Sequence, residues 1–273
     1  MTNRMNRRMG HQEDETPGVD DRALETLDFS GDVVVSRPIL QGWRAPRLEP
    51  GLSPADEADW GQVVASMEDR YFEPGFHWDV LPDGTIAYSD STAYAIKLAS
   101  PDGSVTDELR RPLSPEPVSA RIRRATIAYH LERLEERLER PPSTGLPFMA
   151  PDPEGRRQRI RERGFYHEIP VVRRLKATWN GGLWIQRRGE DPWDDDGPID
   201  VFNADREYLG TLSAGAPVMP VAFGPDGLVV HLVRDELDVP TLVVSRLTSA
   251  RPPPRPRRRS PSRRAATAPP GAR

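Results

Sequence analysis

The chain of 273 residues contains no cysteine, which excludes disulfide bonds, thiolate metal sites and a cysteine nucleophile. It also has no apolar run close to the ~20 residues that a membrane-spanning helix needs. A G-x-S-x-G nucleophile elbow, a phosphate-binding glycine loop and a dinucleotide fingerprint are all missing. The five histidines, at positions 11, 77, 130, 167 and 231, show no metal-ligand spacing. The sequence therefore carries none of these motifs for nucleophilic catalysis, nucleotide binding or metal binding.

Charge is unevenly distributed along the chain. The formal net charge is -4, yet the segment from Arg251 to the end holds eight of the 38 basic residues and no acid. The remainder is therefore clearly acidic, which argues against a body that binds nucleic acid. Any affinity for nucleic acid would have to come from the basic tail.

The two ends of the chain differ from the rest in composition. Residues 1–22 are polar and lack periodicity, and residues 249–273 are rich in Arg, Pro, Ala and Ser, so both are predicted to be disordered. No apolar stretch follows the basic residues near Met1, so there is no signal peptide as the chain stands. This predicts a cytoplasmic protein, or an exported one if a signal and further repeats lie upstream of an incomplete reading frame.

A repeated unit occupies much of residues 23–248. It consists of a glycine turn, a β-rich run, a polar break and a second β-rich run, with copies around Gly84, Gly182 and Gly227. Such repetition favours an all-β, radially repeated architecture. An earlier stretch, 24–43, contains Ser30-Gly31-Asp32 between two β-rich runs and resembles the remains of a further unit.

The clearest copy spans residues 76–113. Its Pro-Asp-Gly turns, at 82–84 and 101–103, supply the side-chain hydrogen bond and the positive φ that a tight reversal needs. Three strands are predicted from them, at 86–90, 94–99 and 105–109. The third copy instead has continuous apolar runs, at 228–233 and 241–247, which predict strands covered on both faces.

An insertion at about 117–168 interrupts the repeats. Within it, Ile127, Leu131, Leu134 and Leu138 are spaced by four, three and four residues, which predicts an amphipathic helix at about 119–140. Its apolar stripe has two interpretations. It covers the sheets, or it docks a partner or a second copy of the chain.

Residues Leu81 to Ser91, with Tyr94 to Leu98 and Pro101-Asp102-Gly103, resemble an NHL-type repeat. That pattern has a D-G turn, a strand ending in A-D-S, a second strand and another D-G turn. The resemblance extends over about 76–248 and implies a β-propeller-like array of four-stranded blades, part of a six-bladed ring, similar to bacterial propeller proteins. The second and third copies depart from the pattern, with Gln186-Arg187-Arg188 and His231-Leu232-Val233-Arg234 where the family has Asp-Ser.

Carboxylates supply the candidate sites. The acidic loop 190–197 contains Asp194 and Asp196, with Asp200 nearby, and oxygen-rich loops closed by glycine can bind calcium. The alternative is a solvated loop, because the spacing matches no known calcium loop. Asp90 and Glu168 could meet across a central channel and share a proton or a metal. Asp90 could instead accept backbone N–H bonds and hold the turn toward Tyr94.

Three tryptophans near the acidic loop have two interpretations. Trp179, Trp184 and Trp193 could form a stacking platform for sugars or bases, or could fill the space between stacked sheets.

Two functions follow from these observations. The first is a non-catalytic binding or scaffold module that recognises a protein, peptide or glycan. The second is a metal-dependent hydrolase, because propellers that resemble gluconolactonases hold a divalent metal with carboxylates and an amide. That resemblance makes Asp90, Asn180 and Asp200 the positions to test.

Overall fold

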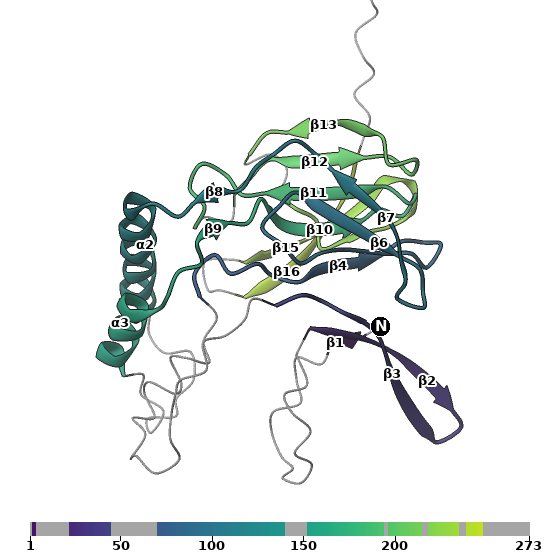
Figure 1. Cartoon of the computed structure of the whole chain (residues 1–273), viewed down its shortest axis with the longest axis horizontal. Helices are drawn as coiled ribbons and strands as arrows, with labels where there is room; N and C mark the ends of the chain where they lie inside the picture. Colours follow the sequence, from purple (N-terminus) through teal and green to yellow (C-terminus); the bar gives the residue numbers. More distant parts are fainter. Residues whose placement is uncertain are drawn as a thin grey trace, which may run out of the picture.

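The computed structural model describes residues 2–3, 22–44, 70–139, 152–193, 196–214, 218–234 and 239–247. Antiparallel β-strands predominate in these ranges (Figure 1). The predicted disordered segments lie almost wholly outside the described residues, as does Asp194.

Four main sheets follow one another along the chain, and we number them I to IV. Sheet I contains β1 (Thr2–Asn3), β2 (Ala23–Ser30) and β3 (Val33–Gln41). Sheet II contains β4 (His77–Val80), β5 (Ile86–Ser89), β6 (Ala95–Ala99) and β7 (Val105–Arg110). Sheet III contains β10 (Val172–Ala177), β11 (Leu183–Arg187), β12 (Ile199–Phe202) and β13 (Tyr208–Leu212). Sheet IV contains β14 (Ala222–Phe223), β15 (Leu228–Arg234) and β16 (Pro240–Arg246), with a short 3-10 turn at Pro225–Gly227 before β15.

In sheets II and III the four strands are joined in chain order, each antiparallel to the next. The three strands predicted in the first copy are confirmed as β5, β6 and β7. The two β-rich runs that flank Ser30-Gly31-Asp32 are also confirmed as strands, since β2 pairs with β3 on either side of Gly31.

One type of turn links many of these strands. The first residue donates its N–H to the carbonyl four residues later, while the fourth donates back to the first. Turns of this type start at Leu81, Ser100, Thr178 and Asn203. The fourth residue has positive φ in each, and it is Gly84, Gly103, Gly181 and Arg206 respectively. Local turn chemistry therefore recurs with the repeat.

The prediction that Gly84 and Gly182 occupy equivalent positions in their repeats is wrong by one residue. Gly181, with φ +82°, occupies the position of Gly84, with φ +87°. Gly182 is needed for a different reason. A Cβ atom there would lie 2.5 Å from the carbonyl oxygen of Phe202 on the neighbouring strand.

The largest apolar core lies between sheets II and III. Ile96 and Leu98 of sheet II are buried together with Leu175 and Ile185 of sheet III. Smaller clusters attach the outer sheets. Leu24 and Leu40 of sheet I join Ile86 and Tyr88 of sheet II, and Met219, just before sheet IV, joins Trp184 and Ile199 of sheet III. The sheets therefore pack in the order in which they occur in the chain.

The insertion between sheets II and III contains two helices, α2 (Ala120–Glu139) and α3 (Pro153–Glu162), at one side of the molecule (Figure 1). The predicted helix is confirmed as α2. Helix α3 was not predicted, although Asp152 caps it by accepting from the N–H of Gly155 at 3.0 Å, and Pro153 begins it. Among the described helices, none has the length and apolar character to cross a bilayer.

Helix α2 contacts the β-structure through Ile122 and not through the predicted apolar stripe, which begins at Ile127. Ile122, near its N-terminus, is buried with Tyr71, Phe72 and Ile169, and Ile169 belongs to the small sheet of β8 (Glu116–Pro117) and β9 (Glu168–Ile169). Within the stripe, Leu134 is buried and Ile127, Leu131 and Leu138 are partly buried, and Leu134 lines a cavity together with residues of α3. The small sheet and α3 therefore hold α2 through these residues.

Two glycines with positive φ provide a test of how sheet I meets sheet II. A Cβ at Gly31 would meet no atom within 4 Å, whereas one at Gly103 would collide with the backbone carbonyl of Ile39. Gly31→Ala should lower the free energy of unfolding by about 1 kcal/mol, the cost of the left-handed conformation. Gly103→Ala should lower it by about 3 kcal/mol or more, because the clash adds to that cost. Urea unfolding would measure both, and equal losses would contradict the contact with Ile39.

Candidate functional site

Asp200 lies at the centre of a buried ionic cluster between sheets II and III. Its carboxylate, on β12, is fully buried. One oxygen lies 2.6 Å from Arg111 Nη1 and 3.1 Å from Arg187 Nε, and the other accepts from the Thr211 hydroxyl at 2.5 Å. Arg111 follows β7 of sheet II, so this ion pair joins the two sheets.

Aromatic rings enclose the same cluster. The guanidinium group of Arg111 lies 4.1 Å from the centre of the Tyr208 ring and 5.9 Å from that of Tyr94. Burial and the nearby Asp200 carboxylate raise the pKa of the Tyr94 phenol far above its ordinary value. Asp200 thus has two cations and a hydroxyl around it, and a metal ion at this carboxylate would be repelled by both guanidinium groups.

Asp90 joins sheet I to sheet II. Its side chain is 4% exposed and accepts from Lys97 Nζ at 2.8 Å and from the backbone N–H of Trp43 at 2.9 Å. The predicted backbone hydrogen bond is thus present, but it comes from a residue 47 positions away and not from the turn toward Tyr94. One carboxylate oxygen therefore fixes Lys97 within sheet II, and the other joins the end of sheet I to sheet II.

The remaining candidate residues belong to other elements than Asp90 does. Glu168 accepts from the Thr92 hydroxyl at 2.8 Å and has partners different from those of Asp90. Asn180 and Asp196 are exposed, each on a loop. Within the described ranges, no group of three His, Asp or Glu side chains is placed to hold a metal ion.

The three tryptophans do not share one surface. Trp184 is buried and packs against Phe223, with ring centres 5.1 Å apart. Trp179 is 57% exposed, and Trp193 is partly buried. Trp184 therefore fills the space between sheets III and IV.

A group of arginines around Glu73 and His77 was not predicted. Glu73, whose side chain is 4% exposed, lies 3.2 Å from Arg70 Nε, 3.9 Å from Arg22 Nη2 and 4.0 Å from Arg44 Nε. These residues come from three separate stretches of sequence. In the sequence, the adjacent pairs Arg173-Arg174 and Arg187-Arg188 are the signal that could have indicated basic surroundings for His77.

His77, on β4, lies beside these arginines. Burial, together with the positive charges of Arg188 and Arg173, lowers the pKa of His77 to about 4. Burial and Arg173 likewise lower the pKa of Arg188 to about 10, and its guanidinium group donates to the Pro192 carbonyl at 2.6 Å. His77 is therefore neutral in the folded protein at pH 7.

No protein-family model matches the chain, and no curated protein is significantly similar to it in sequence.

Removing the charge of Asp200 should destabilise the fold. Asp200→Asn leaves Arg111 and Arg187 without their buried counter-charge, so we expect the free energy of unfolding to fall by about 3–5 kcal/mol. Asp196→Asn, at an exposed carboxylate, should change it by less than about 0.5 kcal/mol. Urea unfolding would measure both variants. Calcium that raised the melting temperature of the unmodified protein but not of Asp200→Asn would contradict this role and indicate a metal site.

His77 should make stability depend on pH. Its pKa is lower in the folded state than in the unfolded chain, so its contribution is fully present above pH 6.5 and is lost as pH falls toward 4. The expected loss is on the order of 3 kcal/mol. Comparing unfolding of the natural protein and His77→Gln at pH 7 and pH 4.5 isolates this term from the titration of carboxylates. Parallel losses in the two proteins would contradict it.

Proposed function

We propose that this protein is a non-catalytic binding or scaffold module of the NHL propeller kind, and that a protein or peptide binds at strands β15 and β16. The proposed blades are the antiparallel meanders of sheets II and III. Three facts support this arrangement. The sheets pack in chain order, β10 lies against β4, and the same turn recurs within both meanders. The described residues form an array of sheets and not a closed ring.

The observation that carries the binding role is the exposure of sheet IV. Strands β15 and β16 were predicted to be covered on both faces, and this prediction is wrong. Leu242 is 65% exposed, Val244 62% and Leu232 45%. Sheet III packs on only part of sheet IV, and no further sheet of the described residues covers the rest.

Four apolar side chains of sheet IV form a patch on one face, while Val233 and Val243 are exposed on the other. Leu232 pairs directly with Leu242, and Val230 pairs with Val244, so these side chains lie side by side. Strand β16 is also the edge of sheet IV, where unpaired backbone groups can accept an added strand. Exposed apolar patches at a sheet edge favour a protein or peptide over a glycan as the ligand.

The rival function, a metal-dependent hydrolase, would rely on Asp90, Asn180 and Asp200. Lys97 holds Asp90, and two arginines hold Asp200. Asn180 is exposed on the loop between β10 and β11. No observation on these residues favours calcium or another metal.

The proposed surface can be tested with displayed extended peptides selected against the purified protein. In the variant Leu242→Lys with Val244→Lys, two apolar contacts are replaced by charges, so affinity for the selected peptides should fall by about 10- to 100-fold. The control, Thr241→Lys with Ser245→Lys, adds the same charge to the other face of β16. Equal binding by the natural protein and the Leu242/Val244 variant would contradict the proposal.

A further inference from the structure

Helices α2 and α3 enclose a groove that is lined by arginines. A cavity of about 350 Å³ lies between them, and five of its lining residues are Arg133, Arg137, Arg156, Arg159 and Arg163. None of the described lining residues is acidic. Such a concentration of one charge in a hollow attracts anions.

The arginines come from two matching helical stripes. On α2 the lining residues are His130, Arg133, Leu134 and Arg137, and on α3 and just beyond its end they are Arg156, Arg159, Ile160 and Arg163. Both sets follow the spacing i, i+3, i+4, i+7, so each occupies one face of its helix. The pattern places one apolar residue per helix, Leu134 and Ile160, between the charged ones.

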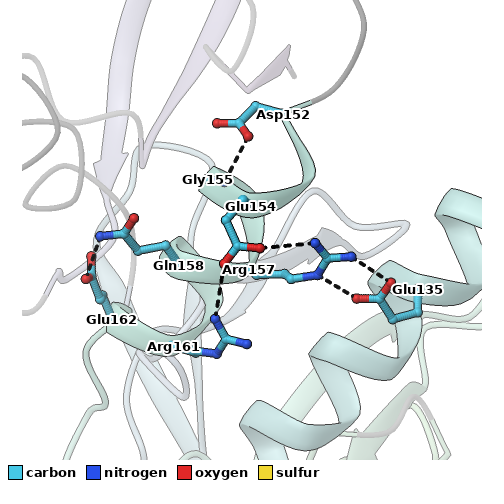
Figure 2. A network of polar contacts seen from close by, with 8 residues as sticks. All are labelled: Glu135, Asp152, Glu154, Gly155, Arg157, Gln158, Arg161 and Glu162. Atoms are coloured by element: carbon cyan, nitrogen blue, oxygen red, sulfur yellow. Dashed lines mark hydrogen bonds and ion pairs between the residues drawn. The ribbon is translucent and has the colours of Figure 1, made fainter.

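Two acidic residues of these helices, Glu135 and Glu154, are paired with arginines outside the groove lining (Figure 2). Glu135 makes a two-pronged pair with Arg157, at 2.8 and 2.9 Å. Glu154 lies 3.2 Å from Arg157 and 3.6 Å from Arg161. These carboxylates neutralise two arginines outside the groove lining, so they are not available to the groove.

Three of the groove arginines have no carboxylate close by. For Arg137, Arg156 and Arg159, no acidic group lies within 4 Å among the residues that the structure describes. Within the part of the chain that the structure describes, the carboxylate paired with Arg133 is that of Glu136, at 3.7 Å and exposed. The groove therefore keeps a surplus of positive charge.

One wall of the groove is rigid and aromatic. The ring of Tyr71 stacks on His130, with centres 5.0 Å apart and planes at 23°, and the guanidinium group of Arg163 lies 4.7 Å from the Tyr71 ring centre. Tyr71 in turn packs against Phe165. This stacking holds His130 and Arg163 in place before a ligand arrives, which reduces the entropy lost on binding.

We propose that this groove binds a ligand through two or three linked phosphate groups. A guanidinium group presents a planar fork of N–H donors that matches the oxygens of a phosphate, and several such groups require a ligand with several negative charges. A cavity of about 350 Å³ accepts a small ligand or one end of a larger one. The same chemistry is offered by free polyphosphate and by the phosphate chain of a nucleotide.

Calorimetric titration of the full chain at low ionic strength tests the proposal, with inorganic tripolyphosphate in one arm and a nucleoside triphosphate in the other. Both should bind the natural protein. The variant Arg156→Gln with Arg159→Gln should bind at least about 10-fold more weakly, since two charge-assisted contacts are lost. The matched control is Arg121→Gln with Arg124→Gln, on the opposite face of α2 and outside the groove lining, and it should bind within about 2-fold of the natural protein.

Two further measurements keep the outcome decisive. Circular dichroism checks that α3 still forms, and Arg156→Lys with Arg159→Lys, which keeps the charge and removes the planar forks, should give an intermediate loss. Tighter binding of the nucleotide than of tripolyphosphate would assign the ligand as a nucleotide, and equal binding would assign the phosphate chain alone. All variants retain the basic segment 251–273, so a difference in binding between them does not arise from that segment. Absence of tripolyphosphate binding, or equal losses in the groove and control variants, would overturn the proposal.

Discussion

The apolar contact between sheets II and III is the interaction on which the other parts of the structure depend. A four-stranded antiparallel sheet with one apolar face is stable only when that face is covered. Here Ile96 and Leu98 of sheet II and Leu175 and Ile185 of sheet III cover each other. Sheet I packs on sheet II, and sheet IV packs on sheet III. The helical insertion lies between sheets II and III in the sequence.

Buried charges determine how the sheets meet. Apolar surfaces allow many relative placements, whereas a carboxylate that must meet a guanidinium group allows few. Asp200 reaches Arg111 across the contact of sheets II and III, and Asp90 reaches the Trp43 N–H at the junction of sheets I and II. Two of the acidic residues that resembled metal ligands in the sequence, Asp200 and Asp90, therefore connect neighbouring sheets.

Sequence reasoning was most successful where the determining forces are local. The Pro-Asp-Gly turns and the flanking β-rich runs predicted β5, β6 and β7 because turn geometry depends on a few adjacent residues. Helix α2 was predicted from its apolar spacing, and α3 could have been found from Asp152-Pro153 at its start.

Features that depend on distant residues were not predictable in the same way. Asp200 and Arg111 are far apart in sequence, and nothing near either residue indicates the other. The apolar runs of sheet IV are typical of buried strands, but burial requires a neighbouring sheet that local sequence cannot supply. The arginine groove likewise arises only when two separate helices lie side by side.

Arg206 occupies a turn position that is glycine in the three related turns, and it has positive φ. Its guanidinium group donates to the carbonyl oxygens of Ala204, at 2.9 Å, and of Gly181, at 2.6 Å, in the turn between β10 and β11. Two loops at the same end of sheet III are thereby fastened to each other. Motion of one loop is transmitted to the other, so this end of the sheet deforms as one piece and not as two independent hairpins.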